Sequence, residues 1–245
     1  MKSKKANFQK SFLSLSVALG VYLTFRWLVF EPYVIPSGSM IPNLLIHDHI
    51  FVNKFIYGIR FPFTKKWMLR FNNPQRGDVL VFRYPKNEDI FYVKRVVGLP
   101  GDTITLKNGI VESVNSMKML NQKIDFNSSK KNLISSIEEQ DFNGKFKDFG
   151  FYLTPLGNKN VVILKEERSY FENKKEIIIP DDSFFVMGDN RDNSSDSRVW
   201  GFVKDDLLIG RAEFIWLSCY EKLSDGAPFC NPTEMRWSRL FKGVW

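Results

Sequence analysis

The sequence predicts a mainly β protein, in which an antiparallel β-sheet domain carries an inserted β-rich lobe and is preceded by one N-terminal transmembrane helix. Three observations support this fold class. Residues 11–30 are an apolar run of transmembrane length, the remainder alternates short apolar runs with turn residues, and residues 106–177 differ in composition from their flanks. At 245 residues and 44% hydrophobic, the chain can bury a full core and is not disordered.

The N-terminal segment SFLSLSVALGVYLTFRWLVF, residues 11–30, contains one charge, Arg26. About 20 residues at a rise of about 1.5 Å span the roughly 30 Å hydrocarbon core. The lysine-rich residues 1–10 predict a basic cytoplasmic tail, with the rest of the chain on the far side of the membrane. A cleaved signal peptide or a buried core helix is the alternative, but the bulky RWLVFEPYVIP offers no small-residue cleavage site.

The chain has a formal net charge of +8, and four of its lysines lie in that tail. The rest of the chain is therefore only mildly basic. No run of lysine and arginine interleaves with aromatic residues, which argues against a nucleic-acid-binding protein. The two cysteines, Cys219 and Cys230, could form one disulfide if this part of the chain lies in an oxidising compartment. Two cysteines without nearby histidines do not make a structural zinc site.

The main domain is predicted from residues 31–105 and 178–245, where turn residues separate short apolar runs such as VLVF, FYVKRVVGL and SFFVM. Residues 106–177 accumulate Asn, Ser and Lys, and we expect an inserted lobe there, partly strand and away from the chemistry. Helix is expected in the apolar segment and in short pieces such as 203–208.

The stretch PSGSM, residues 36–40, presents two serines soon after the apolar run. A serine hydroxyl is a weak nucleophile until a base removes its proton. The two histidines, His47 and His49, alternate onto one face of a possible strand without a third metal ligand, and we expect them at the surface or a sheet edge. The other candidate base is a lysine, which must be buried among apolar groups to be neutral near pH 7.

The segment DIFYVKRVVGLPGD contains such a lysine, Lys94, within an apolar strand. Strand alternation places Lys94 and Arg95 on opposite faces. From this segment alone, an edge strand with two solvated charges is the alternative. A third segment, GDNRDNSSDSRVWGFV at 188–203, crowds aspartates and arginines without the spacing of a calcium-binding EF-hand loop. Its alternating charges favour internal ion pairs that hold a loop rigid.

Taken in order behind an N-terminal anchor, the motifs PSGSMIPNLL, RGDVLVF, YVKRVVGLPGD and GDNRDNSSDSRVWGFV closely resemble bacterial signal peptidase I. The resemblance covers roughly residues 26–105 and 178–216. It implies that Ser39 is the nucleophile and Lys94 the general base, and it makes the main domain the catalytic one. Asn43 stands where the family usually has threonine, and we expect this departure to matter little.

The resemblance also implies supporting roles. Ser37 matches the serine whose hydroxyl helps the backbone N–H of the nucleophile form the oxyanion hole. Ser194 matches a serine that hydrogen-bonds and orients the lysine. Asp196 and Arg198 match an ion pair that supports the loop, and Asp189 belongs to the same motif.

The implied activity is that of a membrane-anchored serine endopeptidase that removes N-terminal signal peptides from exported preproteins. It would cleave after small residues, in an A-x-A pattern, through an acyl-enzyme and without cofactor or metal. The implied substrate pockets are lined by apolar residues that flank the catalytic pair: Tyr33, Ile35, Met40, Leu44, Ile50, Val81, Tyr92 and Val93.

The implied location is the bacterial inner membrane, crossed once, with the N-terminus cytoplasmic and the catalytic domain outside. Implied partners are preprotein signal peptides, the lipid bilayer and the protein export machinery, and no nucleic acid. The stretch RFPFTKKWMLRF, residues 60–71, fits either an interfacial membrane segment or a solvated loop.

Two other functions are alternatives to this one. A self-cleaving Ser-Lys repressor shares the chemistry, but it would need a DNA-binding helix-turn-helix where this chain has its apolar segment. A catalytically inactive relative retained as a membrane-bound scaffold is disfavoured by the presence of Ser39, Lys94 and Ser194.

Overall fold

The computed structural model describes residues 10–20, 22, 30–61, 64–125, 149–166, 175–224 and 229–244. Residues 10–20 are helical. Within the described ranges, no helix is long and apolar enough to cross a membrane. Most of the second half of the predicted anchor lies outside the described residues, so the anchor stays a prediction.

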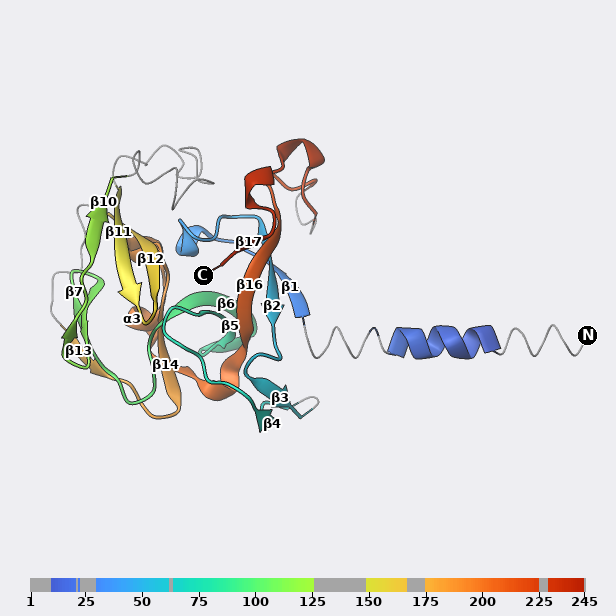
Figure 1. The fold of residues 1–245 in the computed structure, drawn as a ribbon, viewed down its shortest axis with the longest axis horizontal. Helices are drawn as coiled ribbons and strands as arrows, with labels where there is room; N and C mark the ends of the chain where they lie inside the picture. Colours follow the sequence, from blue (N-terminus) through green and yellow to red (C-terminus); the bar gives the residue numbers. More distant parts are fainter. Residues whose placement is uncertain are drawn as a thin grey trace, which may run out of the picture.

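The described chain is mainly β, and its largest sheet has the order β1-β2-β16-β5-β6-β14-β15, with β17 pairing to β16 (Figure 1). Every pairing between these strands is antiparallel. The strands are β1 (Phe30–Val34), β2 (Asp48–Asn53), β5 (Val79–Tyr84), β6 (Asn87–Gly98), β14 (Ser183–Met187), β15 (Val203–Lys204), β16 (Leu208–Ser218) and β17 (Lys242–Gly243).

Three smaller antiparallel sheets complete the described fold. They are the hairpin β3 (Gly58–Arg60) with β4 (Trp67–Arg70); the sheet β13 (Lys175–Ile178), β7 (Thr103–Lys107), β8 (Ile110–Val114) and β9 (Met117–Lys118); and the sheet β10 (Gln122–Ile124), β11 (Phe149–Leu156) and β12 (Lys159–Glu166).

The helical elements after β1 are short: η1 (Gly38–Met40), η4 (Arg191–Asn193), α3 (Ser197–Trp200), η5 (Asp205–Leu207), η6 (Pro232–Glu234) and η7 (Trp237–Arg239). The predicted helical piece at 203–208 is β15 followed by the 3₁₀ turn η5.

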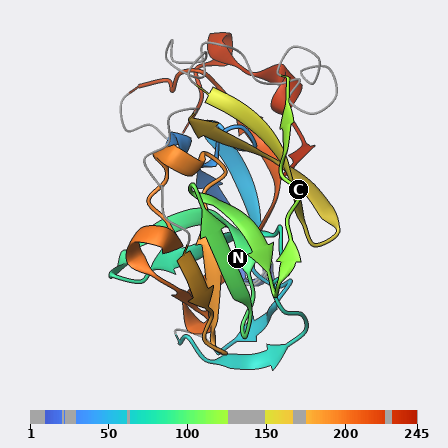
Figure 2. The same cartoon turned by 90° about the vertical axis from the view of Figure 1, so that its left-hand side faces the viewer.

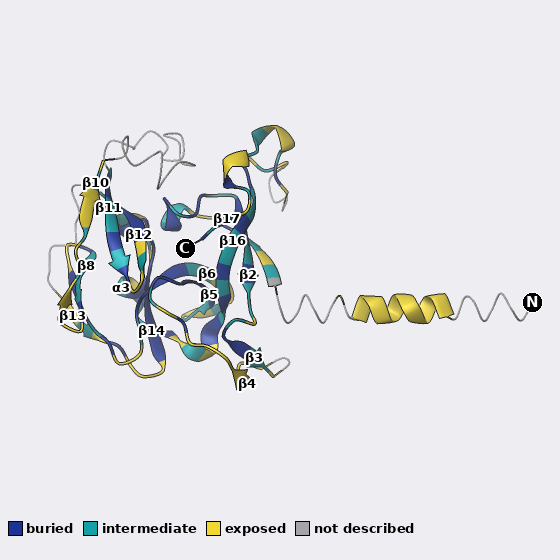
Figure 3. Ribbon diagram, viewed as in Figure 1, coloured by how far each residue is buried: buried dark blue, intermediate teal, exposed yellow. Residues whose placement is uncertain are grey.

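The apolar runs of the sequence become the central strands, which are buried on both faces (Figure 3). β14, with the sequence SFFVM, is buried at all five positions. In β5, successive residues enter two different cores, because side chains alternate across a strand. Val79 and Val81 pack with Ile35 and Ile50, whereas Leu80 and Phe82 pack on the other side with Phe184, Val186 and Trp200.

The sequence led us to expect that the inserted segment lies away from the candidate catalytic residues. In the structure, part of it lies beside them. Ile41, two residues after Ser39, packs against Val162 and Leu164 of β12. The Leu164 N–H donates to the Asp189 carbonyl at 2.8 Å. Figure 2 shows the two yellow strands, β11 and β12, lying across the blue segment that follows β1. The expectation is wrong because β12 is buried on both faces: Val161 and Ile163 pack with other residues of the insertion, whereas Val162 and Leu164 pack on the segment after Ser39.

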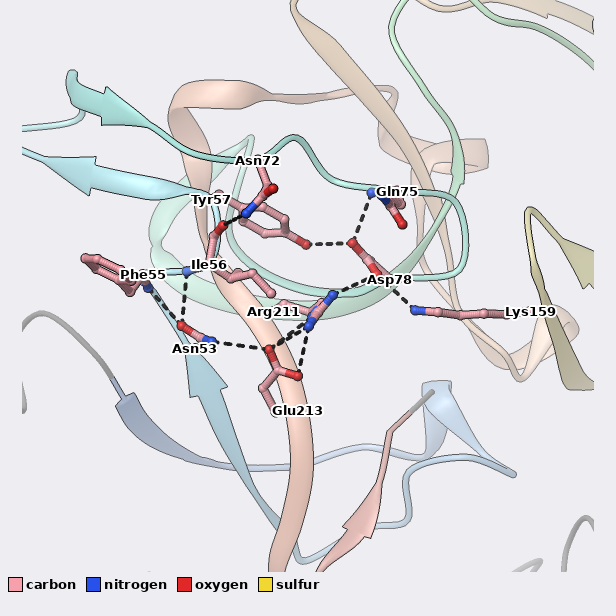
Figure 4. A network of polar contacts seen from close by, with 10 residues as sticks. All are labelled: Asn53, Phe55, Ile56, Tyr57, Asn72, Gln75, Asp78, Lys159, Arg211 and Glu213. Atoms are coloured by element: carbon pink, nitrogen blue, oxygen red, sulfur yellow. Dashed lines mark hydrogen bonds and ion pairs between the residues drawn. The ribbon is translucent and has the colours of Figure 1, made fainter.

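A buried carboxylate, Asp78, joins the main sheet to β12 (Figure 4). Its oxygens accept from the Tyr57 hydroxyl at 3.0 Å and from the Lys159 ammonium at 3.1 Å. Burial, together with the adjacent carboxylate, raises the pKa of Tyr57 and keeps its hydroxyl protonated as a donor. The neighbouring Gly77 carbonyl accepts from Arg95 Nη1 at 2.7 Å, so this network also fixes Arg95.

The segment after β16 is tied back onto the main sheet. The disulfide that the sequence left open is formed between Cys219 and Cys230. Arg239 in η7 is fully buried, forms an ion pair with Asp48, and donates to the Asn43 carbonyl at 3.0 Å. The C-terminal segment therefore braces the loop that follows Ser39.

Candidate active site

Ser39 lies in η1, the turn that follows β1, and Lys94 lies in β6. Lys94 Nζ is 2.7 Å from Ser39 Oγ and 3.0 Å from the Val93 carbonyl oxygen. Burial lowers the pKa of Lys94 to about 8, although the nearby Asp196 and Asp189 carboxylates raise it. A hydroxyl therefore faces an amine that can be neutral close to physiological pH, as general-base activation of a serine requires.

Arg95 points away from Lys94, as strand alternation predicts, and it is also buried. Its guanidinium binds Asp189 through two hydrogen bonds, Nε to Oδ1 and Nη2 to Oδ2, each 2.8 Å long. This pair is 1% and 0% exposed. The alternative of two solvated charges on β6 is therefore wrong.

The loop that begins at Gly188 holds the backbone of the Ser39 turn. The Asn190 N–H donates to the Ser39 carbonyl, and Asn190 Nδ2 donates to the Gly38 carbonyl, both at 3.1 Å. A Cβ on Gly188 would lie 2.3 Å from Ser194 Oγ and 2.5 Å from the Ser39 carbonyl oxygen, so only glycine allows this approach. The loop and the turn are thus packed backbone to backbone.

Asp196 and Arg198 stiffen this loop from within. Asp196 Oδ2 accepts from the Gly188 N–H at 3.0 Å, and Asp196 Oδ1 accepts from Arg198 Nε at 2.8 Å. The side chains of the pair are 0% and 4% exposed. Asp196 also caps the short helix α3 by accepting from the Arg198 N–H. The ion pair expected from the motif is present and buried.

The two supporting serines differ in how they are placed. Ser37 Oγ lies 3.5 Å from Ser39 Oγ, on the exposed side of the turn. Ser194 Oγ is buried and makes no hydrogen bond among the described residues. The hydrogen bond expected between Ser194 and Lys94 is therefore not formed in this structure. Lys94 Nζ instead contacts Ser39 Oγ and the Val93 carbonyl oxygen.

Seven of the eight predicted pocket residues gather in one apolar cluster beside the turn of Ser39. Five of them are buried, and two are partly buried at the margin: Ile35, Met40, Leu44, Ile50 and Val81, then Tyr33 and Val93. Tyr92 belongs instead to the core on the other face, where its ring lies 6.4 Å from that of Trp200.

The sequence predicts both histidines at the surface or at a sheet edge, but the structure buries one of them. His49 is 3% exposed and lies in β2, which is flanked by β1 and β16. Its ring packs edge-on against Trp216, with centroids 5.6 Å apart. His47 precedes the strand, and its Nδ1 lies 3.0 Å from the Tyr220 carbonyl. The expectation is wrong for His49 because β16 covers the edge that β2 would otherwise expose.

Sequence reasoning missed Asn190 and undervalued Asn43. Asn43 Nδ2 donates to the Val162 carbonyl at 2.7 Å and to Asp189 Oδ2 at 2.8 Å. These contacts do not fit the expectation that Asn43 matters little. They join residues 119 and 146 positions apart, so no local pattern could have shown them. The available signal was chemical, since an amide offers two donor hydrogens where threonine offers one.

We expect Asn43→Ala to lower the free energy of unfolding by about 2 kcal/mol, because it removes both donors from buried acceptors. Cleavage should slow as well, because Asp189 and β12 would no longer hold the segment after Ser39. Asn43→Thr should recover part of both losses. The measurements are urea unfolding and turnover. Asn72→Ala removes an exposed amide with one hydrogen bond and is the matched control; equal losses in both alanine variants would contradict the prediction.

The geometry defines a class of protein. A half-buried serine hydroxyl hydrogen-bonded to a buried lysine of lowered pKa, with buried ion pairs behind it, is the arrangement of a serine hydrolase.

Comparison with known proteins identifies the family: the chain belongs to the signal peptidases, peptidase S26, whose family model matches residues 8–217. The enzyme is thus a serine endopeptidase, and the resemblance of its four motifs is confirmed.

Individual relatives share much of the chain. The chain is 39% identical to a signal peptidase I of Buchnera aphidicola subsp. Schizaphis graminum, over 98% of this chain and 83% of that protein. It is 38% identical to one of Pseudomonas aeruginosa, over 86% and 72%. A crystal structure of a signal peptidase I from Enterococcus faecalis is 25% identical over 58% of this chain and 97% of that one, with a TM-score of 0.32.

Proposed function

We propose that this protein is a membrane-anchored signal peptidase that removes N-terminal signal peptides from exported preproteins, with Ser39 as nucleophile and Lys94 as general base. The observation that carries the proposal is the 2.7 Å contact between Ser39 Oγ and Lys94 Nζ within a site that lowers the pKa of the lysine. Membership of the signal peptidase family supports the substrate class.

In the acylation step, neutral Lys94 accepts the proton of Ser39 as Oγ attacks the scissile carbonyl carbon. The developing oxyanion is stabilised by the Ser39 N–H and the Ser37 hydroxyl, an arrangement worth about 3 kcal/mol per donor in other hydrolases. The lysine, now charged, protonates the departing amine. The carbon–nitrogen bond breaks, and the signal peptide remains bound to Ser39 as an ester.

In the deacylation step, Lys94 is neutral again and takes a proton from a water molecule. The resulting hydroxide attacks the ester carbonyl, and the same oxyanion donors stabilise the second tetrahedral intermediate. Lys94 returns the proton to Ser39 Oγ as the ester breaks. Both steps use protons and electron pairs of the substrate, water and these two residues alone.

The apolar cluster beside Ser39 supports the proposal that cleavage follows small side chains, in the A-x-A pattern. We propose that its partly buried members, Tyr33 and Val93, border shallow pockets next to the nucleophile. An extended peptide could add to a sheet edge here and present alternate side chains to them. We propose that Tyr33, Ile35 and Val93, together with the other predicted pocket residues, select alanine-sized side chains.

The proposed location is the inner membrane, with residues 11–30 as a single anchor and the catalytic domain outside the cytoplasm. The support is the apolar composition of this segment and the lysines before it. Because β1 begins at Phe30, such an anchor would hold Ser39 close to the membrane surface where preproteins emerge. The proposed partners are preproteins, the bilayer and the export machinery.

The test is cleavage of one purified preprotein by the full chain in detergent or lipid, with the new N-terminus of the product sequenced. Wild type should cut after a small residue. Ser39→Ala should reduce the rate by about four orders of magnitude or more. Ser238→Ala, which removes the hydroxyl of an exposed serine, is the matched control and should leave the rate unchanged.

A folded wild type that cleaves no preprotein would favour a scaffold that binds peptides without cutting them. Cleavage that survives Ser39→Ala would remove Ser39 from the mechanism and leave the fold without its proposed nucleophile.

A further inference from the structure

A cavity of about 510 Å³ lies on the same sheet as the catalytic pair, toward the N-terminal ends of β1 and β6. It is lined by residues of β1, the β3–β4 hairpin, the β5–β6 hairpin and the start of β16. Neither Ser39 nor Lys94 lines it. The cavity is therefore separate from the site of bond cleavage and needs its own account.

The cavity continues the apolar surface on which the predicted pockets lie. Tyr33 and Phe91 both line it, and their rings meet edge to face with centroids 5.7 Å apart. Tyr33 and Ile209, which also lines the cavity, pack on the same apolar cluster as Ile35 and Val81. Tyr33 is therefore shared by the predicted pockets and the cavity, and its contact with Phe91 lies where the two meet.

The two strands that frame this surface have free edges. Among the described strands, β1 pairs only with β2, and β14 pairs with β6 only between Arg95 and Gly98. Four successive antiparallel pairings separate β1 from β6, so the two strands run in the same direction, and both lead toward the catalytic pair. An extended peptide can add to such an edge.

The distance along β6 between Lys94 and Phe91 determines which residue of a bound peptide lies at the cavity. Phe91 precedes Lys94 by three residues, which is about 10 Å of extended strand. A peptide that runs along β6 in the same direction, with its scissile bond at Ser39, therefore reaches the Tyr33–Phe91 contact with the fourth residue before that bond. The residues beyond that point enter the cavity.

The lining of the cavity indicates which side chains it accepts. Its walls are aromatic and aliphatic, with Tyr33, Ile59, Trp67, Phe91 and Ile209 among them. Its charged residues are four basic and two acidic. Lys54 pairs with Glu31, and Lys65 pairs with Glu88, so Arg60 and Arg83 give the lining residues a net positive charge. The Asp205 and Asp206 carboxylates, which do not line the cavity, lie near Arg60 and offset part of its charge.

Both arginines lie over aromatic rings that line the cavity. The Arg60 guanidinium is 4.0 Å from the centroid of the Trp67 ring, and that of Arg83 is 5.1 Å from the centroid of the Phe91 ring. The cavity therefore combines an aromatic and aliphatic surface with charged groups of net positive charge. Such a lining should accept apolar side chains against its aromatic and aliphatic surface and disfavour lysine and arginine.

We propose that this cavity is an extended substrate subsite that takes the last residues of the apolar core of a signal peptide, beginning four or five positions before the scissile bond. A signal peptide has its apolar region directly before a short segment that ends in small residues, so this spacing places apolar side chains at the cavity. The proposal rests on the proposed function, because it requires the scissile bond to lie at Ser39.

The experiment uses three synthetic peptides with identical sequences from three residues before the scissile bond onward. The short peptide begins there, the second adds four leucines before this point, and the third adds four lysines. kcat and KM are measured for the full chain in detergent. Wild type should show a KM about tenfold lower for the leucine peptide than for the short one. The lysine peptide should show no such gain.

Two variants test the cavity itself. Phe91→Ala removes one wall, and Ile59→Trp fills the space. Both should raise KM for the leucine peptide by about three- to tenfold, while KM and kcat for the short peptide stay within about twofold of wild type. Phe241→Ala, an exposed phenylalanine that does not line the cavity, is the control and should change neither peptide.

Equal KM values for the short and leucine peptides in wild type would overturn the subsite while leaving the proposed function intact. So would variants that affect both peptides equally, since the cavity would then serve folding alone. If wild type cleaved none of the peptides and no preprotein, the proposed function would fail, and the subsite with it.

Discussion

Lys94→Met should reduce kcat/KM for preprotein cleavage by about four to six orders of magnitude, comparable to the loss of a catalytic base in other serine proteases. Methionine keeps the length and apolar stem of the side chain but cannot accept the Ser39 proton. Since Lys94 is 5% exposed, methionine also fits its apolar surroundings. The protein should remain folded, so the loss can be assigned to chemistry.

The same residue should set the pH dependence of cleavage. The pKa of Lys94 is about 8, so only a fraction of the enzyme holds a neutral lysine at lower pH. The rate should rise about tenfold per pH unit below pH 8 and level off above it. A titration midpoint near the ordinary lysine value of 10.5 would contradict the assignment of Lys94 as the base.

The lowered pKa also has a consequence for stability. Below pH 8, Lys94 is charged in both folded and unfolded states, and burying that charge costs the fold about 3 kcal/mol. As pH rises from 8 to 10.5, the unfolded state binds more protons than the folded state, so the cost is relieved and stability increases.

Lys94→Met should therefore raise the free energy of unfolding at pH 7, while abolishing cleavage. Lys118→Met, an exposed lysine on β9, is the matched control and should change neither quantity. A Lys94→Met variant that is inactive and also less stable at pH 7 would indicate a structural role for the lysine.

The central strands and the opposite orientation of two adjacent charges could be predicted from the sequence, because both depend on local alternation. SFFVM becomes β14, buried throughout, and Lys94 and Arg95 face opposite sides of β6. Local alternation could not show that both charges are buried. The four motifs together assigned Lys94 to a catalytic site, but the burial of Arg95 depends on Asp189, which lies 94 positions away.

What the sequence could not show depends on contacts between distant segments. His49 looked like an edge residue because its covering neighbour in β16 is Leu217, far along the chain. The insertion looked remote from Ser39 because its composition is polar, yet β12 has an apolar face that packs on Ile41. Asn43 looked interchangeable with threonine because its two acceptors come from β12 and from the loop at Asp189.

Several of these long-range contacts involve one residue, Asp189. Asp189 receives two hydrogen bonds from Arg95, next to the candidate base, and one from Asn43, which follows the candidate nucleophile. Its own carbonyl accepts from Leu164 of β12. Asp189 therefore links the strand of Lys94, the turn of Ser39 and the insertion. We expect its main contribution to be holding the two candidate catalytic side chains in register.

Asp189→Asn should lower the free energy of unfolding by about 3 to 5 kcal/mol, because it leaves the buried guanidinium of Arg95 without a counter-charge. Removing both charges together, as Arg95→Met with Asp189→Leu, should restore most of that stability, since a buried ion pair often contributes little more than apolar residues of similar size. The measurements are urea unfolding and preprotein cleavage for the single and double variants.

Stability and cleavage should separate in the double variant. It should fold nearly as well as wild type and still cleave slowly, because leucine accepts no hydrogen bond from Asn43 and the Ser39 turn loses that tether. kcat should fall more than KM changes, as expected when the reacting groups are displaced and the apolar cluster stays intact. Recovery of both stability and kcat in the double variant would show that the ion pair serves folding alone, and that other contacts keep Ser39 and Lys94 together.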